Sequence, residues 1–162
     1  MITRVLFNTE IESALSSVYL PYFKGVFSSD NIPVFNDHFS IICNLSNVAE
    51  KGTHFIAISR INSTLFILDS LALNIANNAL STYINEIGRV CTSVIFLKAP
   101  IQSIRSNACG FYCIFFTLLF HASLQRATPK LYHFTDILEG NDAICIQNIN
   151  MLASELKINE NI

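Results

Sequence analysis

A cysteine and a glutamine in this chain stand where they could take part in nucleophilic catalysis. Cys109 lies at the start of a strongly apolar run, residues 111–120, and Gln102 precedes it by seven residues. If the run is a helix, the N–H groups and dipole at its N-terminus favour a thiolate and can hold a developing oxyanion. A nearby amide side chain adds a donor to that oxyanion site. We therefore predict Cys109 as a nucleophile and Gln102 as an oxyanion donor.

A histidine and an aspartate upstream could supply the base. His54 opens one apolar run, residues 55–58, and Asp69 ends a second, residues 65–68. A thiol nucleophile needs a base to take its proton, and the base needs a group that fixes its tautomer and orientation. His54 and Asp69 are the candidates for these two roles. The residues alone also allow plainer interpretations, with a polar histidine at the core edge, an aspartate capping a helix and an ordinary loop amide.

The hydrophobic pattern predicts the elements that must position these side chains. Strands rich in β-branched and aromatic residues are expected at 39–45, 54–60, 64–69 and 92–97, with a tight hairpin at 61–63. Helices are expected at 9–18, 73–87, 108–123 and 143–156, and loops at 27–35 and 128–141. We expect one α+β domain over residues 1–162, with a mixed sheet packed against a central helix that carries Cys109 at its N-terminus.

Two of the expected helices begin with a capping signal. Thr9 is expected to cap the first helix, with Glu12 three residues later completing a capping box. Asn107 is expected to cap the helix that begins at Cys109. Near the end of that helix His121 is expected as a cation that suits the helix dipole.

Composition bears on the class of protein. The 162 residues are 51% hydrophobic and 14% charged, below the ~25% charged that is usual, and mean hydropathy is +0.43. The longest apolar run, residues 108–120, is shorter than the ~18–20 residues that cross a bilayer, so a buried central helix is expected. The first four residues lack the apolar stretch of a signal peptide.

The cysteine content and the net charge indicate which compartment and which kinds of ligand to expect. Five cysteines without a CxxC pair indicate a reducing intracellular compartment, buried thiols such as Cys113 and Cys145, and no metal site. A net charge of −2 and a pI of about 6.0 give no electrostatic basis for strong nucleic-acid binding.

The motifs around the four candidate residues resemble a known family. Gly52-Thr53-His54, Leu68-Asp69-Ser70-Leu71 and the segment 102–110 resemble the cysteine proteases that include the adenoviral maturation protease and the SUMO/ubiquitin-like-protein proteases. The seven-residue spacing from Gln102 to Cys109 and the segment 21–27, PYFKGVF, look like the adenoviral branch. The resemblance covers roughly residues 20–120.

The resemblance implies a papain-like, adenain-like fold and a thiol endopeptidase with a Cys109-His54-Asp69 triad. It implies cleavage after small or glycine-containing sites in structural precursor proteins of a virus or virus-like element, with maturation of capsid or core. Gly52 and Phe55 would lie at the substrate cleft; Phe55 stands where the branch usually has Trp. No cofactor is required for the chemistry.

Adenoviral proteases also use a short viral peptide and DNA as activators. Cys91 is placed like the cysteine that can form a disulfide with that peptide, although its strand context is more typical of a buried, inert thiol. The charge balance argues against DNA as an activator here.

Two alternatives to the viral protease stay open. One is a protease that removes a ubiquitin-like modifier, which Asp69-Ser70-Leu71 favours. The other is an inactive protease fold that serves as an interaction module. For the viral protease we expect a monomer without membrane contact, in the nucleus or cytoplasm of a host and packaged in a virion in some cases.

Overall fold

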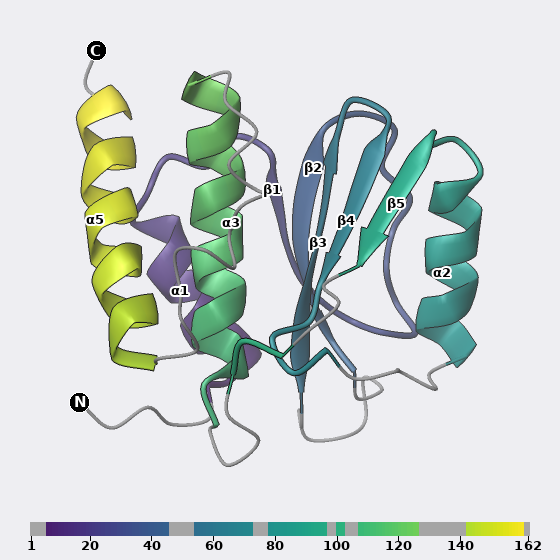
Figure 1. The fold of residues 1–162 in the computed structure, drawn as a ribbon, viewed down its shortest axis with the longest axis horizontal. Helices are drawn as coiled ribbons and strands as arrows, with labels where there is room; N and C mark the ends of the chain where they lie inside the picture. Colours follow the sequence, from purple (N-terminus) through teal and green to yellow (C-terminus); the bar gives the residue numbers. More distant parts are fainter. Residues whose placement is uncertain are drawn as a thin grey trace.

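A mixed five-stranded sheet forms the middle of the molecule, and helices lie on both of its faces (Figure 1). The computed structural model describes residues 6–45, 54–72, 78–96, 100–102, 107–126 and 142–160. The strands are β1 (Phe23–Ser28), β2 (Phe39–Asn44), β3 (Phe55–Ile61), β4 (Thr64–Leu68) and β5 (Ser93–Phe96). The helices are α1 (Asn8–Ser16), α2 (Asn78–Gly88), α3 (Cys109–Arg126) and α5 (Asp142–Glu160).

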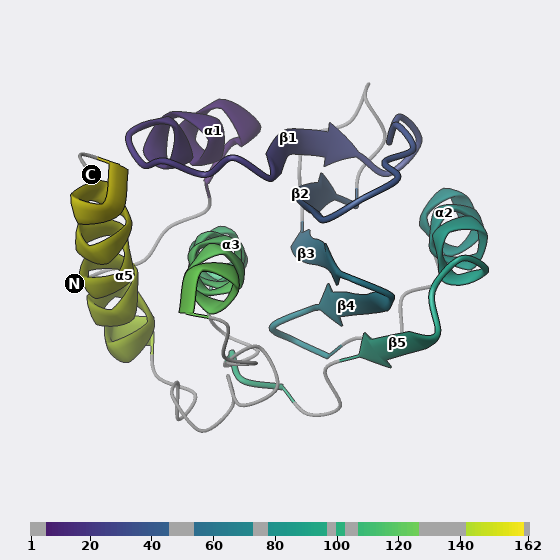
Figure 2. The same ribbon diagram turned by 90° about the horizontal axis from the view of Figure 1, so that it is seen from above.

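The strands lie in the order β1-β2-β3-β4-β5. Both edge strands pair in parallel with their neighbours, whereas β2, β3 and β4 pair antiparallel. Seen from above in Figure 2, α2 covers one face of the sheet and α3 the other, with α5 outside α3 and α1 beside β1. The predicted α+β class and mixed sheet are confirmed.

Both faces of the central strands are buried, because helices cover the sheet on both sides. Alternate side chains point to opposite faces, so neighbouring residues in a strand belong to different cores. Ile41, Ile56 and Ile58 belong to the core between the sheet and α2. Ile42 and Ala57, their neighbours in the strands, belong to the core between the sheet and α3. This explains why β2, β3 and β4 appear in the sequence as nearly continuous apolar runs.

Helix α3 is the central helix that the sequence predicts. It is apolar on all sides because it lies between the sheet and α5, and its side chains Tyr112, Phe115, Phe116 and Phe120 are fully buried. Burial of one such side chain contributes roughly 1.5–3 kcal/mol. No helix in the described part of the chain is long and apolar enough to cross a membrane.

The predicted strands at 39–45, 54–60, 64–69 and 92–97 are present, as is the 61–63 hairpin, where Asn62 has a φ of 53°. Strand β1 was missed, and it takes in the first two residues of the loop expected at 27–35. The expected helix 73–87 is present as α2 from Asn78, and its first five residues lie outside the described residues. The expected loop 128–141 lies wholly outside them.

Both capping predictions are wrong in detail. In α1 the carboxylate of Glu10 accepts the backbone N–H of Phe7 at 2.8 Å, so the reciprocal bond forms two residues earlier than expected. Glu12 Oε1 instead accepts the backbone N–H of Val26 at 3.3 Å, which ties α1 to β1. In α3 the carbonyl of Ala108 accepts the first helical hydrogen bond, from Tyr112 N, so Ala108 takes the N-cap position expected for Asn107.

Candidate active site

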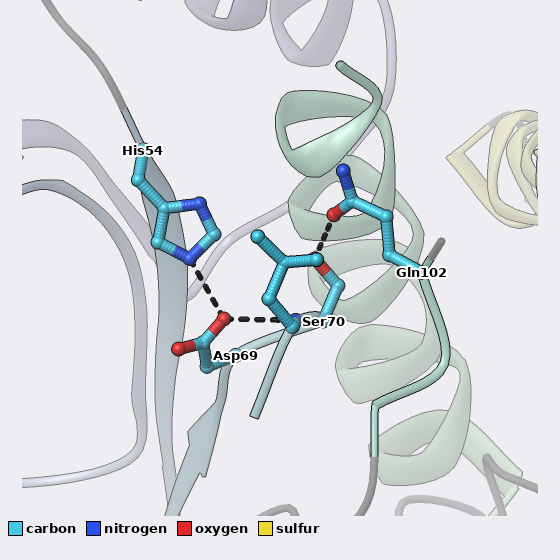
Figure 3. Close-up of polar contacts among 5 residues, drawn as sticks. His54, Asp69, Ser70 and Gln102 are labelled. Atoms are coloured by element: carbon cyan, nitrogen blue, oxygen red, sulfur yellow. Dashed lines mark hydrogen bonds and ion pairs between the residues drawn. The ribbon is translucent and has the colours of Figure 1, made fainter. Parts of the chain in front are cut away.

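His54 and Asp69 meet at one end of the sheet. His54 immediately precedes β3 and Asp69 immediately follows β4, and the two strands are antiparallel neighbours, so these positions lie side by side. His54 Nε2 lies 2.7 Å from Asp69 Oδ1, and both residues are buried (Figure 3). The same Oδ1 accepts the backbone N–H of Leu71 at 3.0 Å, which fixes the carboxylate.

Cys109 is the first residue of α3, and its thiol lies close enough to His54 to raise the pKa of the imidazole. Because Nε2 bonds to Asp69, Nδ1 is the ring nitrogen left for the thiol. Packing of α3 against β3 brings the helix N-terminus to the end of the sheet that carries His54. The thiol is therefore next to a base and to the first N–H groups of a helix, which have no i−4 partner within it.

Opposing effects set the protonation of His54. Burial lowers the pKa of the imidazole, but hydrogen bonds to Asp69 and Cys109, together with Coulombic attraction to both, raise it to about 9. The charged form therefore gains more from its two partners than it loses by leaving water. An imidazolium at neutral pH is the partner that stabilises a neighbouring thiolate.

Gln102 lies beside His54 and Asp69, and it is held by Ser70, the residue after Asp69. The Ser70 hydroxyl donates a hydrogen bond to Gln102 Oε1, and the Ser70 carbonyl accepts the backbone N–H groups of Ile101 and Gln102 at 2.9 and 3.0 Å. In Figure 3 the amide oxygen of Gln102 is turned towards Ser70 and the nitrogen away from it. Gln102 and Ser70 are 4% and 1% exposed, so water has little access to these bonds.

No family model and no curated protein matches this chain. The site has a base that is bonded to a carboxylate and lies next to a thiol, with an amide held nearby. These are the groups needed to form and hydrolyse a thioester.

Three further cysteines are buried in the core. Burial raises the pKa values of Cys43 and Cys145 to about 12, with smaller contributions from Asp30 and Asp142 respectively. Burial, followed by nearby ionisable groups, also raises the pKa of Cys113 well above its ordinary value. These three thiols stay protonated at neutral pH and pack as small core side chains, as predicted for Cys113 and Cys145.

The structure does not test the roles predicted for Gly52, Phe55 and Cys91. Gly52 lies outside the described residues. Phe55 is 1% exposed and packs in the core on the α3 side, which leaves little of its ring for a substrate; its place at the cleft stays a prediction. Cys91 is half-buried between α2 and β5 without a disulfide, and its role with an activating peptide also stays a prediction. Within the described ranges no three His, Cys, Asp or Glu side chains gather as a metal site requires.

One expectation about the C-terminal half of α3 is wrong. His121 is not an exposed cation: it is 2% exposed, its Nδ1 lies 2.8 Å from the Thr117 carbonyl, and its Nε2 accepts the backbone N–H of Tyr22 at 3.2 Å. Burial lowers its pKa to about 4, although the bond to Thr117 opposes this.

Sequence reasoning also missed the supports of Gln102. Ser70 could have been suspected because it follows Asp69 directly. Tyr112 lies one helical turn after Cys109, and its hydroxyl is shared between the Ile101 carbonyl at 3.3 Å and an Asp142 carboxylate oxygen at 2.9 Å.

Proposed function

We propose that the chain is a cysteine endopeptidase in which Cys109 is the nucleophile, His54 the base and Asp69 the group that orients the base. The observation that carries the proposal is the buried His54 imidazole, which is hydrogen-bonded to Asp69 and has the Cys109 thiol close enough to raise its pKa. A structural histidine needs no thiol partner at a helix N-terminus, whereas a thiol protease needs this arrangement.

Acylation starts from the thiolate and the imidazolium. Cys109 Sγ attacks the scissile carbonyl carbon, and the carbonyl oxygen becomes an oxyanion that accepts hydrogen bonds from the Gln102 side chain and the Cys109 backbone N–H. The carbon–nitrogen bond then breaks as His54 gives its proton to the leaving amine. The acyl group remains on Cys109 as a thioester.

Deacylation reverses the roles. Neutral His54 takes a proton from water as the water oxygen attacks the thioester carbon. The second oxyanion collapses, the carbon–sulfur bond breaks, and a carboxylic acid product leaves the thiolate beside the imidazolium. Asp69 keeps Nδ1 aimed at the sulfur throughout by holding Nε2.

The fold and the substrate class follow from the resemblance described above. A helix that presents Cys109 against a sheet that presents His54 supports a papain-like, adenain-like arrangement. The substrates we propose are structural precursor proteins of a virus or virus-like element, cut after small or glycine-containing sites. The site of action would be the infected cell or the virion.

The test is cleavage of fluorogenic peptides ending in Gly-Gly, assayed beside ubiquitin and SUMO conjugates. Wild-type protein should release the fluorophore, and Cys109→Ala and His54→Ala should not. Cys145→Ala is the matched control, because it removes a thiol that is fully buried among core residues and lies on α5. It should keep the activity under conditions in which it stays folded, and folded Cys109→Ala with wild-type turnover would contradict the proposal.

A deconjugating protease is the second candidate, because the acidic residue that binds His54 is an aspartate, as in the SUMO-protease branch. Turnover of a SUMO or ubiquitin conjugate well above that of any peptide would favour this second function. An inactive interaction module would show neither cleavage nor preferential alkylation of Cys109.

A further inference from the structure

We propose that Ser70 is a positioning residue of the oxyanion hole, which sets the direction in which the Gln102 amide points. This inference rests on the proposed function, and it assigns Ser70 no contact with the substrate. Ser70 acts on Gln102 through both its backbone and its side chain.

The backbone contact fixes where the Gln102 main chain lies. The carbonyl of Ser70 accepts two consecutive N–H groups, from Ile101 at 2.9 Å and from Gln102 at 3.0 Å. The Tyr112 hydroxyl contacts the carbonyl of Ile101 from the other side, at 3.3 Å. The residue before Gln102 is thereby held between the end of β4 and the first turn of α3.

The side-chain contact fixes which end of the amide faces Ser70. The Ser70 hydroxyl donates its proton to the oxygen of Gln102, and with this bond in place the NH₂ group points away from Ser70 (Figure 3). The opposite orientation would place the carbonyl oxygen where the amide donor is needed, and its lone pairs would repel a developing oxyanion. Both side chains are almost fully buried, so water does not compete for the bond.

The adjacency of Asp69 and Ser70 gives the contact its mechanistic meaning. Asp69 Oδ1 holds the base, and the next residue along the chain holds the oxyanion donor. The end of β4 therefore holds both the group that orients the base and the group that orients the oxyanion donor. A shift of this strand end would move both groups together.

The test is a double-mutant cycle on kcat for a peptide that the wild type cleaves. Ser70→Ala should lower kcat by about 10–10²-fold, less than the ~10²–10³-fold typical of losing an oxyanion donor, and should leave KM nearly unchanged. In the Gln102→Ala background, Ser70→Ala should cause no further loss, because its effect passes through the amide. Ser70→Thr keeps the hydroxyl and should recover most of the activity.

The matched control is Ser59→Ala. Ser59 is also a fully buried serine, and its hydroxyl bonds to Ser40 Oγ at 3.3 Å within the sheet. The Ser59→Ala variant loses a comparable hydrogen bond, and Ser59 does not contact Gln102. This variant should therefore have the kcat of the wild type. If Ser70→Ala and Gln102→Ala reduce kcat independently and multiply, Ser70 has a general structural role and the proposal is overturned.

A second readout does not depend on catalysis. The side-chain NH₂ resonances of Gln102, assigned by their loss in Gln102→Ala, should have a high ¹⁵N order parameter in the wild type and a lower one in Ser70→Ala. An order parameter below about 0.6 in the wild type would overturn the proposal even where Ser70→Ala fails to fold. Retention of activity in Cys109→Ala would instead overturn the proposed function and leave this measurement valid.

Discussion

Replacement of Asp69 by Asn tests the electrostatics of the candidate site directly. The substitution keeps the shape of the side chain but removes the charge that lies 2.7 Å from His54 Nε2. Because burial alone lowers the pKa of His54, and its two partners raise it to about 9, loss of the carboxylate should bring the pKa down. A carboxylate so close usually shifts a pKa by 1–3 units, so we expect a fall of about 1–2.

The same change has a predictable effect on stability. Elevation of the His54 pKa from its ordinary 6.5 to about 9 corresponds to roughly 3 kcal/mol of stability, at 1.36 kcal/mol per pKa unit. The sign follows from proton binding: the folded state binds the proton more tightly, so this stability is fully present below pH 6.5 and is lost as pH rises through about 9. Asp69→Asn should therefore destabilise the protein by roughly 1–3 kcal/mol at pH 6 and by much less at pH 10.

Two assays measure these effects. Urea unfolding at pH 6 and pH 10 gives the free energies, and the pH dependence of kcat/KM gives the basic limb, where the imidazolium that protonates the leaving amine is lost. In Asp69→Asn this limb should move to lower pH by about 1–2 units. Asp37→Asn, at an exposed carboxylate, is the control and should change neither. Identical basic limbs in Asp69→Asn and wild type would refute the assignment of Asp69 to His54.

Four further predictions follow from individual side chains. Gln102→Ala should lower kcat by roughly 10²–10³-fold while Cys109 still alkylates with iodoacetamide, and an unchanged kcat would remove the amide from the oxyanion hole. Mass spectrometry should find Cys109 alkylated before the other four cysteines; labelling of a different cysteine that abolishes activity would contradict its role as nucleophile. Burial lowers the pKa of His121 to about 4, so the folded state should lose stability as pH falls from 6.5 towards 4. The reason is that a proton on Nε2 would break the hydrogen bond from Tyr22 N. A His121→Gln variant with the same acid unfolding profile as the wild type would argue against this. Tyr83→Phe should raise the free energy of unfolding by roughly 1 kcal/mol in urea titrations, since the buried Tyr83 hydroxyl has no hydrogen-bond partner among the described residues, and a loss of stability would contradict that.

The sequence predicted the central strands and α3 because their patterns have one physical origin. Strands β2, β3 and β4 are buried on both faces, and α3 is buried on all sides, so apolar residues are required at nearly every position. Strand β1 was missed because it lies at the edge, is only half-buried, and contains Gly25 with a φ of 131° at an irregularity in its pairing with β2. Local composition carries little information about such a strand.

The four site residues could be singled out as candidates because His54, Asp69 and Cys109 each adjoin an apolar run and Gln102 lies in the loop before Cys109. What the sequence could not supply is how they are held. The contact between Ser70 and Gln102 spans 32 residues, and the contact between His121 and Tyr22 spans 99. Neither leaves a periodic trace in the sequence, because hydrogen bonds between distant segments depend on how the sheet and helices pack.

The hairpin of β3 and β4 has a consequence for how activity would arise during folding. His54 and Asp69 are 15 residues apart and belong to adjacent antiparallel strands, so their pairing closes a short loop at low entropic cost. Cys109 comes 40 residues after Asp69 and reaches His54 only when α3 packs onto the sheet. A chain that has formed the hairpin but has not docked α3 holds an oriented base without a nucleophile. Under the proposed function, partly folded chains are therefore inert, and peptidase activity marks the completed core.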